Sequence, residues 1–328
     1  MRDRFGREIG YARISITDRC NLRCVYCMPE SGVKSLRHAD ILSYENILRI
    51  CRVFAALGIR KLRVTGGEPL VRKGAVGLIA SLKKLEGVSV TLTTNGLLLP
   101  EKARELRDAG LDGVNISLDT RDPSAYFRLT RGGDVRRVLA GIDAAVETGI
   151  PQVKVNCVPL GEDSREDVLQ VAALARDRAV HVRFIEMMPI GPGTAFVGVD
   201  NRRLRQWLER EYGDWTPLEE SLKKESLNIG YGPARYGSLT GFQGKIGFIS
   251  PISDCFCEKC NRIRLTSTGL LRTCLNRSDG VSLLPALSDL NDSRLFADIR
   301  GAILEKPERH DFVTQKEAAR GTMFKIGG

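Results

Sequence analysis

Hydrophobic and polar residues alternate in several short stretches of the chain, and longer stretches with helical spacing lie between them. Residues 11–17 have the two-residue period of a β-strand, with one apolar and one polar face. Residues 43–57 have apolar side chains at helical spacing, and Ser43 and Gly58 supply the signals for the start and the end of a helix. The chain therefore opens with a strand followed by a helix.

The same alternation of strand and helix continues to about residue 190. Further strands are predicted at 61–65, 88–93, 113–118, 152–158 and 180–186. Further helices are predicted at 74–85, 101–109, 135–148 and 165–178. Strands that alternate with helices pair in parallel. Six such units, rather than the eight of a closed barrel, predict an α/β fold with an incomplete (β/α)6 TIM-like barrel.

The polar faces of the predicted strands are rich in basic residues. Arg13 and Arg63 lie on the polar faces of the first two strands, and Lys154 lies on that of a later one. The apolar faces must meet the helices, which leaves the polar faces for the inside of the barrel, where several buried cations require an anion. The alternative is that these strands are half-exposed and that the charges face water.

The second half of the chain has a different pattern. The run Gly191-Pro192-Gly193 ends the alternation, and residues 203–212 have the pattern of an amphipathic helix. Residues 230–247 contain six glycines, which is typical of turns and short strands. We therefore expect two modules, the barrel at residues 1–235 and a smaller C-terminal module at residues 236–328.

Composition agrees with a folded protein of about two domains, since the 328 residues are 42% hydrophobic and 27% charged. No run of about 18 apolar residues occurs and the first residues lack the apolar stretch of a secretion signal, so we expect a cytoplasmic protein without a membrane span. In that compartment the nine cysteines serve as ligands or core residues, and the helical spacing around Cys51 favours the core. The net charge of +10 predicts an anionic partner, either nucleic acid or a phosphate-bearing small molecule.

Three cysteines, Cys20, Cys24 and Cys27, follow the first predicted strand with the spacing C-x3-C-x2-C. Thiolates suit iron–sulfur clusters, and a closed [4Fe–4S] site uses four of them. Three cysteines would leave one iron open to bind a small molecule and to pass it an electron. A zinc site is the alternative, and its fourth ligand would have to be found, with only His38 nearby.

This spacing, with the aromatic Tyr26 before the last cysteine, resembles the signature of the radical S-adenosylmethionine (SAM) enzymes. The turn Gly66-Gly67-Glu68-Pro69 after the second strand resembles a second motif of that family. Taken alone, its glycines show only that the backbone can approach a ligand closely. The resemblance implies that SAM occupies the open iron and contacts Tyr26, Gly67, Ser117 and Met188. A plain core position is the other interpretation of Met188.

A second set of cysteines, Cys257, Cys260 and Cys274, lies in the C-terminal module with the spacing C-x2-C-x13-C. Cys255 stands beside it, and spacing alone does not choose between a zinc ribbon with Cys255 as the fourth ligand and an iron–sulfur cluster. Arg262 and Arg264 share one face of a predicted strand, where two guanidinium groups next to a metal cluster suit a polyphosphate. The alternative is a basic strand that faces water.

The whole chain then resembles the GTP 3′,8-cyclase family, which performs the first step of molybdenum cofactor biosynthesis. The resemblance rests on both cysteine sets, the Gly-Gly-Glu-Pro turn, the run from Asn261 to Thr266, and Gly327-Gly328. It implies a second [4Fe–4S] cluster on Cys257, Cys260 and Cys274. It implies GTP contacts by Arg13, Arg63, Thr94, Lys154, Arg262, Ile263 and Arg264. It implies catalytic roles for Arg13, Arg262, Arg264, Gly327 and Gly328, with the double glycine reaching into the active site.

The implied activity is radical cyclisation of GTP to (8S)-3′,8-cyclo-7,8-dihydroguanosine 5′-triphosphate, with two [4Fe–4S] clusters and SAM as cofactors. The implied partners are GTP, a flavodoxin- or ferredoxin-like one-electron reductant and a downstream cyclic pyranopterin monophosphate synthase. A homodimer is compatible with this prediction, and neither a membrane nor nucleic acid is expected as a partner. One alternative is a radical SAM peptide-modifying enzyme with an auxiliary cluster, which predicts more C-terminal cysteines. Another is a zinc-dependent nucleic-acid-binding protein, suggested by the charge of +10.

Overall fold

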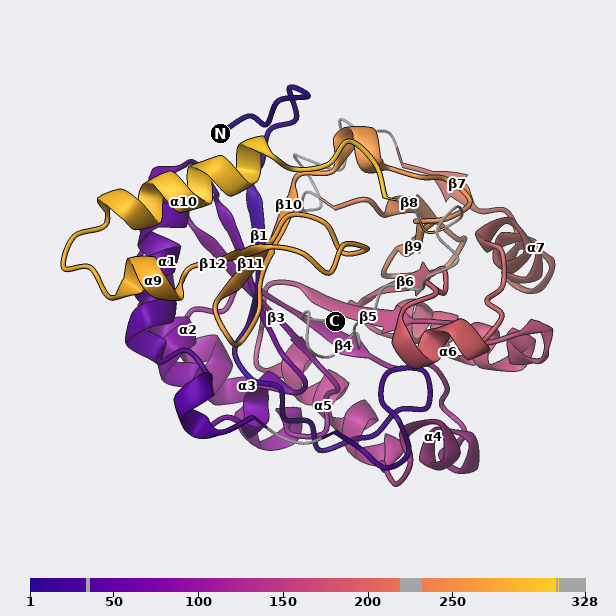
Figure 1. Ribbon diagram of the computed structural model, residues 1–328. Helices are drawn as coiled ribbons and strands as arrows, with labels where there is room; N and C mark the ends of the chain where they lie inside the picture. Colours follow the sequence, from indigo (N-terminus) through magenta and orange to yellow (C-terminus); the bar gives the residue numbers. More distant parts are fainter. Residues whose placement is uncertain (34–35, 219–231, 311, 313–328) are drawn as a thin grey trace.

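Twelve strands join into one sheet in the part of the chain that the computed structural model describes, which is residues 1–328 except 34–35, 219–231, 311 and 313–328. The order across the sheet is β12-β11-β10-β1-β2-β3-β4-β5-β6-β9-β8-β7. Figure 1 shows helices on the outside of the curved central strands. The sheet is thus built from a central barrel wall with later strands added at both edges.

Six parallel strands make the central wall, and their order along the sheet is their order in the chain. They are β1 (Tyr11–Ser15), β2 (Lys61–Thr65), β3 (Ser89–Thr94), β4 (Gly113–Ser117), β5 (Val153–Cys157) and β6 (His181–Ile185). The helices between them are α1 (Tyr44–Ala56), α2 (Ala75–Lys83), α3 (Leu99–Asp108), α4 (Pro123–Thr130), α5 (Val135–Glu147) and α6 (Arg165–Asp177). The predicted incomplete (β/α)6 barrel is confirmed, with every predicted strand and helix within a few residues of its expected bounds.

Local sequence accounts for these elements. Ser43 accepts a hydrogen bond from the backbone N–H of Asn46 and so caps α1, as its position predicts. Gly58, with φ of 87°, lets the chain turn after the helix. Ile50 and Phe54 are fully buried against the apolar face of the sheet, so the polar face is left for the inside of the barrel.

Strands from the second half extend both edges of this wall. β10 (Arg262–Leu265) pairs in parallel with β1, and β9 (Ile246–Ile249) pairs in parallel with β6. The remaining strands pair antiparallel beyond them: β11 (Leu270–Arg272), β12 (Val281–Ser282), β8 (Arg235–Ser238) and β7 (Thr216–Pro217). The chain returns to both sides of the barrel after residue 190, so two distant segments of sequence complete one wall (Figure 1).

Helices outside the barrel wall include α7 (Asn201–Tyr212), α9 (Leu284–Leu287) and α10 (Ser293–Leu304). The sequence predicted α7 but not α4, α9 or α10. The short α4 begins with Pro123 at its first turn and leaves Phe127 exposed, so its apolar pattern is weak. Among the described residues, no helix combines the length and the apolar character that crossing a bilayer requires.

Candidate active site

A cavity of about 330 Å³ lies inside the barrel and is lined by the polar faces of the strands. Both cysteine triads line it. Cys20 follows the C-terminal end of β1, whereas Cys260 precedes the N-terminal end of β10, which runs parallel to β1. The first triad, Cys20, Cys24 and Cys27, and the second triad, Cys257, Cys260 and Cys274, therefore belong to opposite ends of the strands.

The first triad sits in a tightly turned loop. The backbone N–H of Cys27 donates to the carbonyl of Cys24 at 3.0 Å, and the N–H of Leu22 donates to Cys20 Sγ at 3.4 Å. Burial raises the pKa of the Cys20 thiol to about 11, and burial together with Cys27 raises that of Cys24 well above its ordinary value. A thiolate here needs positive charge from bound iron, which is what three cysteine ligands of a cluster receive.

The spacing of the donor atoms distinguishes the two triads from a site for a single metal ion. Among the described residues, the only three Cys, His, Asp or Glu donors that all lie within 4.8 Å of one another are Cys255, Cys257 and His310. Neither triad is therefore gathered as closely as the ligands of one metal ion. Cysteines that bind three different irons of a cluster lie farther apart than the ligands of one ion, so the wider spacing of both triads is compatible with a [4Fe–4S] cluster that has one iron left open.

The Gly-Gly-Glu-Pro turn packs directly against the loop that carries the first triad. A Cβ atom on Gly67 would lie 2.3 Å from the carbonyl oxygen of Arg19, so no other residue fits without moving the backbone. The buried carboxylate of Glu68 accepts hydrogen bonds from Thr94 Oγ1 at 2.8 Å and from the N–H of Asn95 at 2.7 Å. Burial raises the pKa of Glu68 to about 7. The motif thus has a structural task in joining two loops of the cavity.

Tyr26 connects the first triad to the strand β4. Its hydroxyl donates a 2.6 Å hydrogen bond to Asp119, whose other oxygen accepts from the N–H of Val158. Ser117 and Met188 line the same cavity, as Tyr26 and Gly67 do. The four residues predicted to contact SAM therefore line the same cavity as the first triad, and their contacts with SAM stay predictions.

Cations from neighbouring strands line the middle of the cavity. Arg13 pairs in register with Arg63 on β2 and with Arg264 on β10. Arg63 and Arg264 are buried, which contradicts the alternative that these strands face water. Burial lowers the pKa of Arg63 to about 9, and burial with Arg13 and Arg262 nearby lowers that of Arg264 well below its ordinary value. Within the described residues, neither Arg13 nor Arg63 has a carboxylate partner, so this region is built to receive an anion.

Three further lining residues were not predicted as site residues. Tyr11 lies beside Lys61 and Arg63, which approach its ring to 5.5 and 5.3 Å. Burial alone would raise the pKa of Tyr11, but Arg63, Arg13 and Lys61 lower it to about 8. Arg183 on β6 donates to Asn156 Oδ1 at 2.9 Å and lines the cavity. The period of two places Tyr11 with Arg13 on β1 and Lys61 with Arg63 on β2, and the register of β6 with β5 places Arg183 on the face that carries Lys154.

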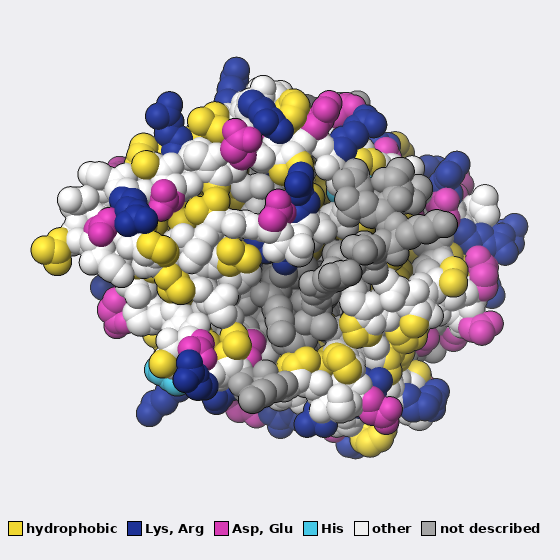
Figure 2. Space-filling view, in the orientation of Figure 1, with side chains coloured by type: hydrophobic (Ala, Val, Ile, Leu, Met, Phe, Trp, Pro, Cys, Tyr) yellow, Lys and Arg dark blue, Asp and Glu magenta, His cyan; other side chains and the backbone are white. Residues whose placement is uncertain are grey.

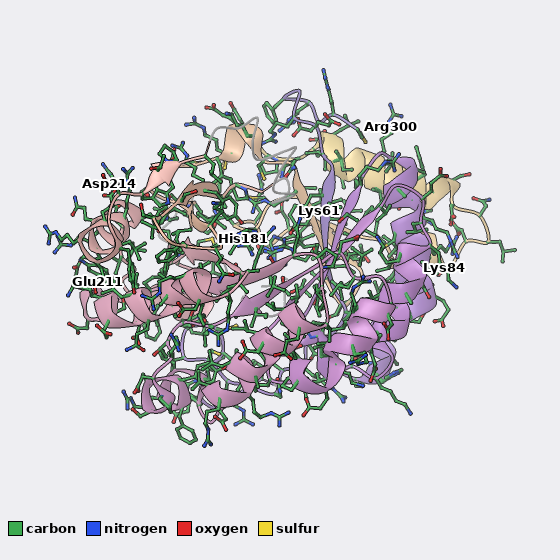
Figure 3. All side chains as sticks on the ribbon, turned by 180° about the vertical axis from the view of Figure 1, so that it is seen from behind. Lys61, Lys84, His181, Glu211, Asp214 and Arg300 are labelled. Carbon is green, nitrogen blue, oxygen red and sulfur yellow. The ribbon has the colours of Figure 1, made fainter. Side chains whose placement is uncertain are left out.

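Figure 3 shows where the charged residues lie when the molecule is seen from behind. Lys61 and His181, at the N-terminal ends of β2 and β6, lie toward the centre, whereas Lys84, Glu211, Asp214 and Arg300 lie around the outside. On the face drawn in Figure 2, Lys and Arg side chains are scattered among Asp and Glu and do not gather in one patch. Part of the net charge of +10 is thus inside the barrel, which does not favour the nucleic-acid-binding alternative.

The second triad is held by two buried cations. Arg7 donates to the carbonyls of Cys257 at 2.9 Å and Pro307 at 2.7 Å. Lys306 donates to the carbonyl of Arg262 at 2.9 Å and also to that of Thr273. Burial alone would raise the pKa of Cys260. The positive charges of Arg262 and Lys306 outweigh this effect and lower the pKa to about 6, so this cysteine is poised as a thiolate ligand.

The remaining predicted residues have mixed positions. Arg262 lines the cavity and lies over the ring of Phe256 at 4.7 Å, and Lys154 also lines it. The hydroxyl of Thr94 is already engaged by Glu68. Ile263 is fully buried on the opposite face of β10, which leaves only its backbone for a GTP contact. Gly327 and Gly328 lie outside the described residues.

Comparisons with known proteins agree over the whole chain. Residues 14–175 match the radical SAM superfamily, and residues 180–312 match the family described as Molybdenum Cofactor Synthesis C. The GTP 3′,8-cyclase of Clostridium perfringens (strain 13 / Type A) is 42% identical over 331 residues, covering 100% of both chains. The GTP 3′,8-cyclase of Geobacter sulfurreducens is 43% identical over 330 residues, covering 99% of both.

The fold also resembles solved structures. The crystal structure of Streptococcus suis SuiB has a TM-score of 0.60 and 15% sequence identity, covering 90% of this chain and 68% of that chain. At this identity the likeness concerns the fold alone. It agrees with a radical SAM barrel followed by a C-terminal module.

Proposed function

This chain belongs to the GTP 3′,8-cyclase family of radical SAM enzymes, and on that premise we propose that it holds SAM and GTP in the barrel cavity and cyclises GTP to (8S)-3′,8-cyclo-7,8-dihydroguanosine 5′-triphosphate. This is the first step of molybdenum cofactor biosynthesis. The observation that carries the proposal is one cavity lined by two cysteine triads and by a buried group of cations.

The first triad, Cys20, Cys24 and Cys27, holds the [4Fe–4S] cluster that binds SAM, and the second triad, Cys257, Cys260 and Cys274, holds the other cluster. When bound and reduced, the first cluster and SAM supply the carbon radical that removes a hydrogen atom from C3′ of GTP. Tyr26, Gly67, Ser117 and Met188 orient SAM beside that cluster.

The protein's own part is to bind, orient and shield. Arg13, Arg63 and Arg264 receive the triphosphate, because three guanidinium groups in register offer forked donors to phosphate oxygens. Lys154 and Arg262 extend this surface along the cavity. Enclosure by the barrel keeps water away from the reacting atoms, and the tail residues Gly327 and Gly328 are proposed to complete the site.

The proposed partners follow from the reaction. A flavodoxin- or ferredoxin-like protein supplies the electron for the first cluster, and a cyclic pyranopterin monophosphate synthase consumes the product. A cytoplasmic location and a homodimeric state are proposed with these partners. The proposed module boundary near residue 235 falls where β8 begins and the chain returns to the barrel edge.

The test separates the two triads. Cys24→Ala should stop SAM cleavage, because the cluster whose open iron binds SAM would be lost. Cys257→Ala should keep some SAM cleavage and make no cyclised product. The control is Cys51→Ala. Cys51 lies on the buried face of α1 and does not line the cavity, so this variant should keep both reactions. The measurements are anaerobic 5′-deoxyadenosine release, product formation and iron content on the same sample. Cyclised product from a Cys257→Ala protein would refute the role of the second triad.

A further inference from the structure

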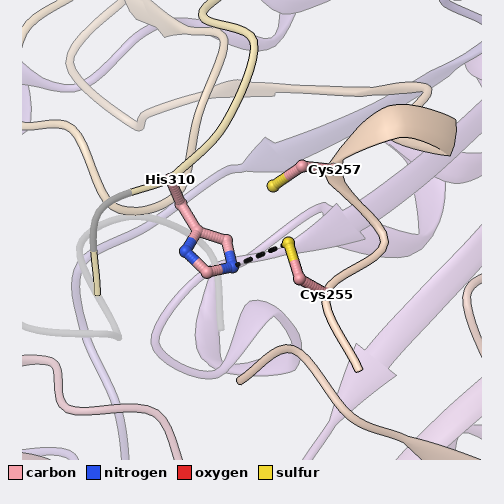
Figure 4. A group of neighbouring side chains, drawn as sticks. All are labelled: Cys255, Cys257 and His310. Atoms are coloured by element: carbon pink, nitrogen blue, oxygen red, sulfur yellow. Dashed lines mark hydrogen bonds between the residues drawn. The ribbon is translucent and has the colours of Figure 1, made fainter. Parts of the chain in front are cut away.

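Two side chains beside the second triad, Cys255 and His310, have no role in the proposed reaction, and their donor atoms lie close to Cys257 of that triad. Cys255 Sγ lies 3.5 Å from His310 Nε2, and both atoms lie within 4.8 Å of Cys257 Sγ (Figure 4). The two cysteines come from the loop before β10 and the histidine from the segment after α10, 55 residues later in the chain. The fold therefore brings together two thiols and one imidazole that the sequence keeps apart.

The spacing of these donors is that of ligands on one metal ion. For a tetrahedral ion with bonds of about 2.3 Å to sulfur and about 2.1 Å to nitrogen, the sulfur and nitrogen atoms lie roughly 3.6 Å apart. The observed separation of Cys255 Sγ and His310 Nε2 is 3.5 Å. The zinc ribbon considered from the sequence would have used Cys260 and Cys274 as ligands together with Cys255 and Cys257. Neither Cys260 nor Cys274 belongs to the group of three donors, and His310 stands there instead.

We propose that Cys255, Cys257 and His310 form a mononuclear site for a thiophilic divalent ion of the Zn²⁺ class. Two thiolates and one imidazole are a common donor set for such an ion and leave a fourth position. The carbonyl oxygen of Pro251 lies 2.8 Å from His310 Nε2 and accepts a hydrogen bond from it in the ion-free chain, so an ion bound at Nε2 replaces this hydrogen bond. Cys255 is exposed, which gives the ion a path from solvent. Binding releases the two thiol protons and moves the imidazole proton from Nε2 to Nδ1, which gives up the 3.5 Å hydrogen bond that Nδ1 accepts from the N–H of Phe312.

The site shares Cys257 with the second triad, and this gives it a consequence for assembly. When the Cys257 thiolate binds a zinc ion together with Cys255 and His310, it is not placed to bind an iron of the more widely spaced second cluster. The chain can therefore hold either the single ion or the second cluster, but not both. This part of the inference rests on the proposed assignment of Cys257 to that cluster, whereas binding of the ion itself does not.

The binding test uses Co²⁺ as a coloured probe on the full-length chain before cluster reconstitution, with Cys20, Cys24 and Cys27 changed to Ala to remove the first triad. We expect one equivalent of Co²⁺ bound with thiolate charge-transfer bands and tetrahedral visible bands. Cys255→Ser and His310→Ala should each weaken binding at least about tenfold, the lower limit seen even for supporting residues of metal sites. The matched control Cys260→Ser should leave the affinity unchanged.

The opposite ranking would overturn the proposal. If Cys260→Ser or Cys274→Ser abolished Co²⁺ binding and Cys255→Ser did not, the ion would sit in the second triad. Failure of the folded chain to bind Co²⁺ would be equally decisive, with near-ultraviolet circular dichroism to show that it is folded. Cys255→Ser is an isosteric change at an exposed position, so its result does not depend on folding.

The second measurement tests exclusion by iron content in the same background. Reconstitution should place about four irons on the chain, and one equivalent of Zn²⁺ added first should prevent this. In the Cys255→Ser protein the same Zn²⁺ should leave the iron content unchanged. Equal iron loss with and without Cys255 would refute exclusion through this site. A chain that takes up no iron even without Zn²⁺ would instead refute the second-cluster assignment, and the Co²⁺ result would stand.

Discussion

The Tyr26 hydroxyl donates a 2.6 Å hydrogen bond to the carboxylate of Asp119, and this bond ties the loop of the first triad to the end of β4. Both groups are buried, and burial with Asp119 nearby raises the pKa of Tyr26 well above its ordinary value. The phenol therefore stays protonated and remains a donor. In the chain, Tyr26 lies between Cys24 and Cys27, and Asp119 follows Ser117 by two residues, so the bond fixes the loop of the first triad relative to the strand that carries Ser117.

Tyr26→Phe should destabilise the protein by about 1.5–3 kcal/mol, because it removes a hydrogen bond to a buried carboxylate. The backbone at this position is unchanged, so SAM should still bind, with an affinity reduced by loosening of the loop. Tyr212→Phe is the matched control, since the Tyr212 hydroxyl donates to the carbonyl of Leu169 away from the cavity. Urea unfolding and SAM titration check both variants. Equal SAM affinity and stability in the Tyr26→Phe and wild-type proteins would show that the hydrogen bond does not hold the loop of the first triad in place.

Asp119 predicts a dependence of stability on pH. Burial raises its pKa from 3.8 to about 6, so between these values the folded protein binds more protons than the unfolded chain. Stability should therefore fall as the pH rises from about 4 to about 6, by roughly 3 kcal/mol from this group. The measurement is the urea midpoint against pH for the wild-type and Asp119→Asn proteins. The difference between the two curves should follow this fall, and parallel curves would contradict the assignment.

The sequence predicted the fold and the site best where hydrophobic and polar residues alternate regularly. The period of two along the strands predicted that Arg13, Arg63 and Lys154 face the inside of the barrel, and all three line the cavity. The same period also placed Tyr11 and Arg183 there, but an aromatic ring and a single arginine in an apolar strand did not stand out. Strand–helix alternation predicted the barrel because each unit is defined by contacts within a few residues of sequence.

Contacts between distant segments could not be predicted in this way. Arg7 reaches the carbonyls of Cys257 and Pro307, and nothing within a few residues of Arg7 indicates either partner. His310 meets Cys255 only because the segment after α10 returns to the loop before β10. The short helix α4 was missed since its burial depends on α5 rather than on its own apolar pattern.

Gly67→Ala should disrupt the first triad's loop, because the added Cβ would lie 2.3 Å from the carbonyl oxygen of Arg19, which is backbone and cannot rotate away. We expect loss of iron from the first cluster and of SAM binding, together with a destabilisation of about 1–3 kcal/mol from the forced shift. Gly77→Ala in α2 is the control, since a Cβ there meets nothing within 4 Å and helical alanine is favoured. Iron content and SAM titration distinguish the variants. A Gly67→Ala protein with full iron and normal SAM affinity would show that the two loops do not need this close approach.

Arg264→Ala should weaken GTP binding and leave SAM binding unchanged. A charge-assisted bond to a buried anion is worth about 1.5–3 kcal/mol, which corresponds to a loss of about 10- to 150-fold in affinity. Arg300→Ala on the outer surface makes the same change in net charge and should alter neither affinity. Calorimetric titration with each ligand gives the comparison. Equal losses of GTP and SAM affinity would indicate a misfolded module. Unchanged GTP affinity would show that Arg264 does not bind the triphosphate.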